Sequence, residues 1–200
     1  MKIEKDRIII RIADETDAGK LLEIYAPYVE RTAITFEYTV PSLEEFQGRI
    51  RETLQKYPYV AAEKDGEILG YAYTGPLVKR AACNWAAETS IYLKENRRQM
   101  GIGRKLYEAL EEISKSQNIL NLNACIACPQ KEDAYLTRNS VQFHEHMGYR
   151  FVGEFHQCGY KFGTWYNLVW MEKNLGDHID SPGDVIWFPE LLRQGKNPLQ

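Results

Sequence analysis

The spacing of hydrophobic residues along the chain switches repeatedly between the period of a strand and the period of a helix. An isoleucine-rich stretch at 7–13 alternates loosely, whereas Ile102, Leu106 and Leu110 recur at helical spacing. The first half of the chain is predicted to form a strand at 7–13, a helix capped by Asp14 or Thr16, a helix from Ser42 to Pro58, and strands at 59–63, 67–74 and 83–93. The pattern then predicts a helix from about 102 to Ser116 and a strand at about 119–127. A helix carrying Leu136, Ser140, Phe143 and Met147 follows, and strands at about 149–158 and 164–173 complete the order. This order predicts an α/β fold in which helices cover both faces of one mixed sheet.

Local signals mark several boundaries. Ser42-Leu-Glu-Glu45 has the sequence of a capping box. The spacing of the helix that follows places Leu43, Phe46, Ile50 and Leu54 on one apolar face. Asp65-Gly66 is typical of a tight turn between two antiparallel strands. Gly148 fits the left-handed residue that ends a helix.

The composition changes at about residue 176. Prolines and glycines interrupt the remaining chain, while Trp187, Phe188 and Leu191 form an apolar cluster that would rarely stay in water. We therefore expect one domain at 1–175 and a tail at 176–200. The tail packs either on its own domain or on a partner subunit, and the sequence leaves both possibilities open.

A glycine turn followed directly by a helix marks the best candidate for a binding site. Gly101 and Gly103 open the helix predicted to end at Ser116, and the free N–H groups of a helix's first turn bind phosphate oxygens. The local basic residues are Lys94, Arg97, Arg98, Arg104 and Lys105. The spacing fits neither a Rossmann fingerprint nor a Walker loop. The alternative is a basic loop that merely caps a surface helix.

Charge and composition exclude several classes of protein. The 200 residues carry a net charge of −3, which argues against a nucleic-acid binder and makes the basic cluster a local feature. No apolar run approaches the roughly 20 residues that span a bilayer, and the N-terminal stretch lacks the pattern of a signal peptide. We expect no membrane partner and a cytoplasmic location.

Two of the four cysteines, Cys125 and Cys128, form a CxxC sequence that raises the possibility of a zinc or redox site. No second CxxC and no pair of histidines at ligand spacing accompanies it. The pair lies in an apparent buried strand and its exit, which favours ordinary reduced thiols. We expect no metal.

The sequence Arg98-x-x-Gly101-x-Gly103, placed after a strand, resembles the pyrophosphate-binding motif of the GNAT acyl-CoA N-acetyltransferases. The stretches at 70–93, 143–149 and 159–175 narrow the resemblance to the phosphinothricin acetyltransferase branch of that family, over about residues 7–175. The resemblance implies a GNAT fold, acetyl-CoA as co-substrate, a small-molecule amine as acceptor and a homodimer.

The resemblance also implies roles for individual residues. Glu88, in the sequence Trp-x-Ala-Glu, matches the family's catalytic glutamate, whereas a lone strand glutamate would ordinarily face solvent. In the GNAT fold the strand at 83–93 carries a bulge and splays from its parallel neighbour, so its backbone pairs with the pantetheine arm. The residues implied in cofactor binding are Ile91, Tyr92 and Leu93, one of whose N–H groups would serve as the oxyanion donor, and Arg98, Gln99, Met100, Gly101, Ile102, Gly103 and Arg104.

His144 is the candidate for protonating the leaving thiolate. Many relatives have a tyrosine four residues after a small residue in the late helix, and here Ser140 is followed by His144. A histidine there either donates a proton or simply packs, and the two interpretations stay open. Thr137 stands where the motif usually has asparagine, so that cofactor contact is not expected to match.

The acceptor site is expected to include Arg80, which matches an arginine after the Gly-Pro sequence and would bind a carboxylate through two hydrogen bonds. Phe36, Tyr73 and Trp165 are candidate pocket walls, although each could equally lie in the core. Glu37 departs from the relatives, where this position is commonly basic.

The sequence thus predicts direct transfer of acetyl from acetyl-CoA to the α-amine of a small amino-acid-like acceptor such as phosphinothricin or methionine sulfoximine. Two alternatives remain. One is acetylation of another amine, such as an aminoglycoside, a polyamine or a peptide N-terminus. The other is an acyl-CoA-binding sensor without turnover, against which the presence of Glu88 argues.

Overall fold

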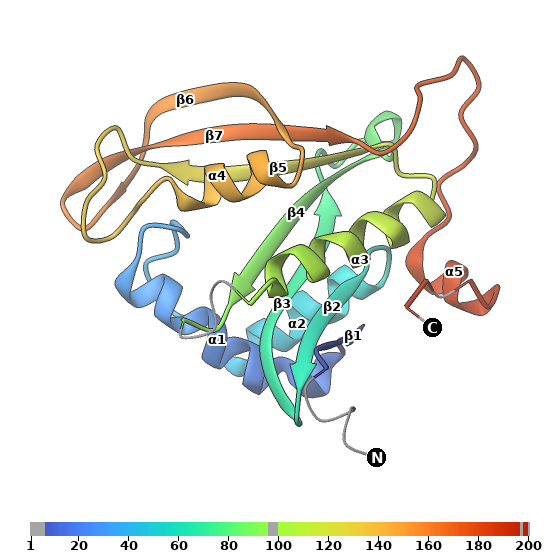
Figure 1. Ribbon diagram of the computed structural model, residues 1–200, viewed down its shortest axis with the longest axis horizontal. Coiled ribbons are helices and arrows are strands. Elements are labelled where there is room, and N and C mark those ends of the chain that lie inside the picture. The colour runs from blue at the N-terminus through green and yellow to red at the C-terminus, as the bar shows by residue number, and fades with distance from the viewer. Residues whose placement is uncertain (1–6, 96–99, 197, 200) are drawn as a thin grey trace.

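The computed structural model describes residues 7–95, 100–196 and 198–199. These residues form a seven-stranded mixed sheet flanked by helices (Figure 1). The strands lie in the order β1-β2-β3-β4-β5-β7-β6, with β4 and β5 parallel and the other neighbours antiparallel. The elements are β1 (Ile9–Ile12), α1 (Ala18–Arg31), α2 (Leu43–Leu54), β2 (Tyr59–Lys64), β3 (Glu67–Pro76), β4 (Ala86–Leu93), α3 (Ile102–Ser116), β5 (Asn121–Cys128), α4 (Asn139–His146), β6 (Arg150–Lys161), β7 (Thr164–Asn174) and α5 (Phe188–Arg193). The predicted mixed sheet is confirmed.

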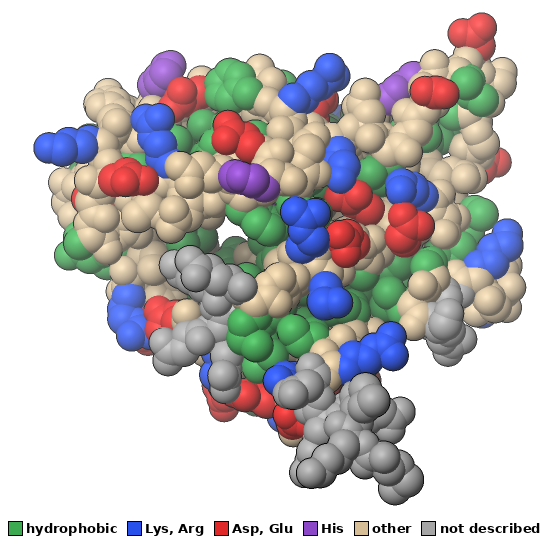
Figure 2. All heavy atoms as spheres, in the orientation of Figure 1, with side chains coloured by type: hydrophobic (Ala, Val, Ile, Leu, Met, Phe, Trp, Pro, Cys, Tyr) green, Lys and Arg blue, Asp and Glu red, His purple; other side chains and the backbone are tan. Residues whose placement is uncertain are grey.

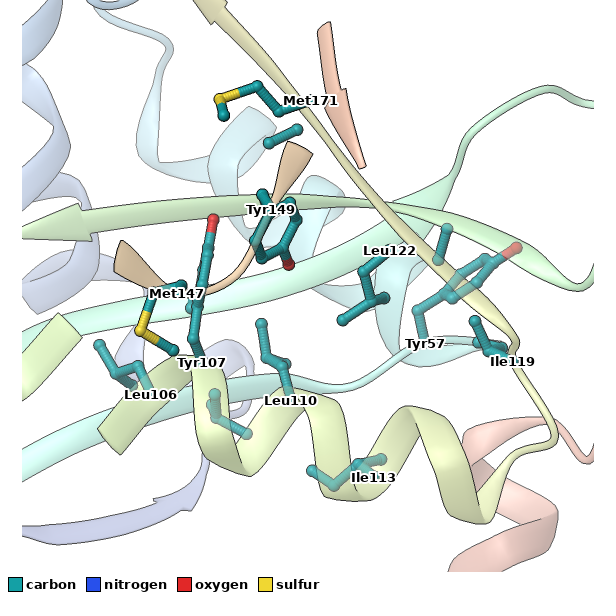
Figure 3. Close-up of a cluster of buried hydrophobic side chains, with 14 of the residues drawn as sticks. Tyr57, Leu106, Tyr107, Leu110, Ile113, Ile119, Leu122, Met147, Tyr149 and Met171 are labelled. Carbon is teal, nitrogen blue, oxygen red and sulfur yellow. The ribbon is translucent and has the colours of Figure 1, made fainter. Parts of the chain in front are cut away.

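Helices cover both faces of the sheet. On one face, α1 and α2 pack through a core that includes Tyr25, Phe46 and Tyr71. On the other face, Leu106, Tyr107 and Leu110 of α3 point toward the sheet (Figure 3). Burying an aliphatic side chain of this size stabilises the fold by roughly 1.5–3 kcal/mol, so α3 is held chiefly by its apolar stripe.

The predicted turn and helix end are confirmed by their backbone angles. Asp65 and Gly66 have φ values of 51° and 80°, which the two-residue turn between β2 and β3 requires. Gly148 has a φ of 86° just after α4. The start of that helix was predicted too early, because α4 begins at Asn139 and Leu136 instead lies buried in a small cluster before it.

At the start of α2 the capping box is only half formed. The Ser42 hydroxyl accepts a hydrogen bond from the N–H of Glu45 at 3.1 Å, but the Glu45 carboxylate accepts one from Arg49 at 2.6 Å rather than turning back to Ser42. Leu43 is 48% exposed. The reciprocal cap and the inward position of Leu43 were therefore wrong.

The parallel pair at the centre of the sheet separates soon after it begins. β4 pairs with β5 only at Ala86–Glu88, opposite 121–123. Beyond Glu88, β4 follows β3 to Leu93, while β5 follows β7 to Cys128, so the two strands diverge (Figure 1). The expected splay is confirmed. The expected bulge in β4 is wrong, because its ladder with β3 keeps one register from Ala87 to Leu93.

The residues after β7 return to the α3 side of the sheet. Phe188 and Leu191 of α5 are fully buried in the same core as α3. The N–H of Phe188 donates to the carbonyl of Lys56 at 3.0 Å, and the Trp187 ring meets the Tyr57 ring edge-on at 5.6 Å. This segment therefore lies against its own chain.

Candidate active site

A pocket of about 710 Å³ opens on the sheet face covered by α1 and α2. Its floor consists of tyrosines from β2, β3 and β4, and its walls come from α2 and from the segment between β3 and β4. The lining includes Tyr25, Arg49, Tyr59, Tyr71, Tyr73, Val78, Lys79, Arg80 and Tyr92. We call it the acceptor pocket. Its size and its mixture of aromatic and charged groups are typical of small-molecule sites.

Two of the residues predicted for substrate binding, Tyr73 and Arg80, line this pocket. Phe36 and Trp165 do not. The Phe36 ring lies against the backbone of Gly159, where an added Cβ would come within 2.1 Å of it. Trp165 is exposed on β7 and contacts the Tyr160 ring at 5.0 Å.

Glu88 lies where the pairing of β4 with β5 ends, directly opposite Gly75 of β3. Because side chains alternate along a strand, Glu88 shares a face with Ser90 and Tyr92, the face of the acceptor pocket. The side chain is half-buried, and burial raises the pKa of its carboxyl group. A carboxylate with a raised pKa binds a proton more readily, as a general base at neutral pH requires.

A second, smaller pocket of about 70 Å³ lies between β4 and β5, where the two strands separate. Thr89, Ser90, Ile91 and Tyr92 line one side, residues 124–127 of β5 line the other, and Tyr107, Ser140 and His144 close it from the α3 face. We call it the strand gap. Tyr92 lines both pockets, so the acceptor pocket and the strand gap are adjacent. The molecular surface is hollowed beside α4, where the strands diverge (Figure 2).

Backbone hydrogen bonds distinguish the three positions predicted to pair with a cofactor. Leu93 is already bonded, since its N–H donates to the Tyr28 hydroxyl at 3.2 Å and its carbonyl accepts from that hydroxyl at 2.6 Å. Lys94, one residue on, donates its N–H to Leu69 of β3. Because donors alternate along an antiparallel ladder, the N–H of Tyr92 also points to β3, and that of Ile91 points into the strand gap.

His144 is buried, with 5% exposure, and both ring nitrogens are hydrogen-bonded. Nδ1 lies 2.7 Å from the carbonyl of Ser140, and Nε2 lies 2.9 Å from the hydroxyl of Tyr107. Burial lowers the pKa of His144 to about 4. The imidazole is therefore neutral at pH 7, and the Ser140 carbonyl, which can only accept, holds its single proton on Nδ1.

The two glycines of the predicted phosphate site are needed for different structural reasons. Gly101 has a φ of 72° and precedes the first residue of α3, so it supplies the left-handed turn. An added Cβ at Gly103 would lie 3.1 Å from the ring of Phe143, so Gly103 permits α3 to pack on α4. Met100 and Arg104 are exposed beside this turn, whereas Arg98 and Gln99 lie outside the described residues.

Acetyl-CoA fits these residues. The first N–H groups of α3, from Ile102 onward, have no acceptor within the helix and would bind the pyrophosphate. The N–H of Ile91 and the strand gap would receive the thioester end. Bound there, acetyl-CoA would supply an activated acyl group.

The described residues contain no group of three or more side chains able to hold a metal ion. Cys83, Cys125, Cys128 and Cys158 are unpaired, and burial raises the pKa of Cys125 to about 12. No helix in the described ranges is both long enough and apolar enough to cross a bilayer.

Sequence reasoning did not single out two residues of the site, Tyr107 and Arg49. Tyr107 occupies the apolar stripe of α3 and so resembles an ordinary core residue, although a buried hydroxyl on such a stripe calls for a partner. Arg49 lies on the polar face of α2, and nothing local places it on a pocket wall.

The fold and the two adjacent pockets define a class of enzyme, and comparison with known proteins gives the family. Residues 10–170 match the acetyltransferase (GNAT) domain family, so the chain belongs to it and is an acetyl-CoA-dependent N-acetyltransferase. The predicted GNAT fold and co-substrate are confirmed.

Curated relatives fall in the expected branch. A phosphinothricin N-acetyltransferase of Streptomyces viridochromogenes is 27% identical, covering 87% of this chain and 91% of the relative. An L-methionine sulfoximine/L-methionine sulfone acetyltransferase of Pseudomonas aeruginosa is 31% identical, covering 86% and 98%. A phosphinothricin acetyltransferase from Sinorhizobium meliloti, solved in complex with acetyl-CoA, is similar with a TM-score of 0.81 and 28% identity, covering 92% of this chain and 96% of that one.

Proposed function

We propose that this enzyme transfers acetyl from acetyl-CoA directly to the α-amine of a small amino-acid-like acceptor, of the kind named for its relatives: phosphinothricin, methionine sulfoximine or a similar compound. The observation that carries the proposal is the position of Glu88. Glu88 is the last residue of β4 that pairs with β5, and its side chain lies on the same sheet face as Tyr92, which lines both pockets. Burial raises the pKa of its carboxyl group. Arg80 in the same pocket provides a guanidinium for the acceptor's α-carboxylate.

The proposed mechanism assigns one task to each group. Glu88 takes a proton from the acceptor's ammonium group, because only the neutral amine has a lone pair for attack. The N–H of Ile91 donates to the oxyanion that forms at the acyl carbon. Neutral His144 holds the Tyr107 hydroxyl at the other side of the gap. Since the imidazole proton is committed to Ser140, we assign His144 to positioning Tyr107, whose hydroxyl lines the strand gap and would give its proton to the departing thiolate.

A thiol-release assay with acetyl-CoA over a panel of amines tests the proposal. The panel contains phosphinothricin, methionine sulfoximine, methionine sulfone, a polyamine, an aminoglycoside and a peptide with a free N-terminus. Fastest release with the amino-acid analogues is expected. Preference for a polyamine, aminoglycoside or peptide would contradict the acceptor assignment, and acetyl-CoA binding without release over any amine would indicate a sensor.

The same proposal includes a homodimer, supported by an apolar surface on the β6–β7 hairpin. β6 is an edge strand, and the exposed apolar residues of the hairpin are Phe151, Val152, Phe155, Tyr160 and Trp165. So many exposed apolar side chains on one edge hairpin are unusual on a monomer, and a second copy of the hairpin would cover part of them. Sedimentation equilibrium should give a dimer for the wild type and a monomer for Phe155→Glu; a monomeric wild type would contradict this part.

A cytoplasmic location completes the proposal. It is supported by the four unpaired cysteines, because reduced thiols are typical of that compartment.

A further inference from the structure

The C-terminal segment builds one end of the acceptor pocket. Trp187, the residue before α5, lines the pocket together with Lys56 and Tyr57, which lie between α2 and β2. Trp187 lies beyond residues 10–170, the part of the chain that matches the acetyltransferase family. A segment outside the matched domain therefore contributes directly to the wall of the proposed substrate site.

Hydrogen bonds on both sides of Trp187 fix its position. The N–H of Phe188 donates to the carbonyl of Lys56 at 3.0 Å. The N–H of Ile186 donates to the carbonyl of Gln117 at 2.9 Å. The fully buried Gln117 side chain donates in turn to the carbonyls of Lys56 and Ile186, at 3.0 and 3.1 Å. Because Phe188 is also buried in the core, Trp187 is held in one place by the residues on either side of it.

The Trp187 ring contacts the two residues that share this end of the pocket. Its centroid lies 5.6 Å from that of Tyr57, with 71° between the ring planes. Nζ of Lys56 lies 4.9 Å from the centroid of the Trp187 ring, which is within the range of a cation–π contact. Trp187 itself is half-buried, so part of its ring stays available to a ligand.

The same segment is also bonded to the opposite wall of the pocket. Nε1 of Trp85 donates to the carbonyl of Gly183 at 2.8 Å. Trp85 follows Asn84, which lines the pocket, and precedes β4, the strand that carries Glu88. Residues 183–187 thus connect the segment between β3 and β4 to the α2 side of the pocket.

We propose that Trp187 is a binding residue for the acceptor: its ring packs against the carbon skeleton of the bound amino acid and closes this end of the pocket. The inference rests on the proposed function, because it takes this pocket to be the acceptor's. An aromatic ring held in one position offers a small ligand a large apolar contact. Trp187 lines neither the strand gap nor the first turn of α3, where acetyl-CoA would bind. Its loss should therefore weaken binding of the acceptor and leave binding of acetyl-CoA nearly unchanged.

Trp187→Ala and Trp187→Phe test the assignment. In Trp187→Ala, KM for methionine sulfoximine should rise about tenfold, while kcat and the Kd of acetyl-CoA from calorimetry should each change less than about threefold. Trp187→Phe keeps an aromatic ring at the position, so KM should return to within about threefold of the wild type. A role in the fold alone would not separate the two substrates in this way.

Leu192→Ala is the matched control. Leu192 lies in α5 and packs against the same core, but it lines neither pocket. The substitution removes packing from the C-terminal segment without changing the pocket wall, so KM should stay within about threefold of the wild type. Melting followed by circular dichroism gives a temperature at which all three variants are folded, and the kinetics are measured there.

The outcomes keep the two proposals apart. If the wild type does not acetylate methionine sulfoximine, the proposed function fails and this inference falls with it. If the wild type acetylates it and Trp187→Ala leaves KM unchanged, the inference alone is overturned. Equal losses of acceptor and acetyl-CoA affinity in Trp187→Ala, or an equal rise in KM in Leu192→Ala, would also overturn it, because either result would mean that Trp187 supports the fold instead of contacting the acceptor.

Discussion

The hydroxyl of Tyr107 lies 2.9 Å from Nε2 of His144 and 3.2 Å from Oγ1 of Thr89 in the interior of the protein. Nδ1 of His144 must donate to the carbonyl of Ser140, so Nε2 can only accept, and the single proton of the Tyr107 hydroxyl lies between Nε2 and Thr89. Protonation of His144 would require this pair to reorganise, because Nε2 would become a donor. The relationship links a residue of α4 to one of α3 and makes both sensitive to pH.

The first prediction concerns stability in acid. The pKa of His144 is about 4 when folded and about 6.5 when unfolded, so the unfolded chain binds the extra proton first as pH falls. The contribution of His144 is fully present above pH 6.5 and is lost as pH falls toward 4, by about 3 kcal/mol. Urea unfolding at pH 7 and pH 5 should show a smaller loss for His144→Gln than for the wild type. Equal losses would mean that the imidazole is not buried in its neutral form.

The second prediction concerns Arg80 and the acceptor's carboxylate. A lysine cannot reproduce the paired hydrogen bonds of a guanidinium, so Arg80→Lys should raise KM for the amino-acid acceptor roughly tenfold to a hundredfold. A decarboxylated analogue never uses this contact and should be almost unaffected. Steady-state kinetics with both compounds check the difference. Similar losses for both would show that Arg80 supports the fold or the cofactor site instead.

The third prediction concerns Gly101 at the start of α3. Its φ of 72° is strained for a β-branched residue, and a side chain there would also crowd an incoming phosphate. Gly101→Val should weaken acetyl-CoA binding at least about tenfold in calorimetry, with the fold intact. Gly195→Val is the matched control, because Gly195 has a φ of 69°, open surroundings and a place in the C-terminal tail. Unchanged affinity for the Gly101 variant would contradict the pyrophosphate site.

Features set by neighbouring residues could be predicted from the sequence. The turn at Asp65-Gly66 and the end of α4 at Gly148 each depend on one or two backbone angles that few other residues adopt. The apolar stripe of α3 predicted its helix from Ile102 to Ser116 for the same local reason.

Features that depend on distant residues could not be predicted in this way. The insertion of β7 between β5 and β6 and the exposure of Leu43 depend on which surfaces meet in the folded chain. The same holds for the ion pair between Arg49 and Glu37 and for the bond between Tyr107 and His144, whose partners lie 12 and 37 positions apart. Glu88 and Arg80 were identified through family resemblance, since a lone acid or arginine in a sequence gives no such signal.

The fourth prediction concerns Glu88, the proposed general base for acetyl transfer. Glu88→Gln keeps the shape of the side chain and removes the proton acceptor, so kcat should fall on the order of 100-fold or more. Acetyl-CoA affinity should stay near that of the wild type. Because burial raises the pKa of Glu88, its charged form is disfavoured in the folded protein, and the variant should melt at the same or a higher temperature at neutral pH.

The most direct measurement is kcat/KM for the acceptor against pH, for the wild type and for Glu88→Gln. The wild type should lose activity on the acid side with an apparent pKa above that of an ordinary glutamate, because Glu88 must be ionised to accept the proton. The variant should have a much lower rate without that acid limb. An unchanged rate and an unchanged acid limb in Glu88→Gln would contradict the account.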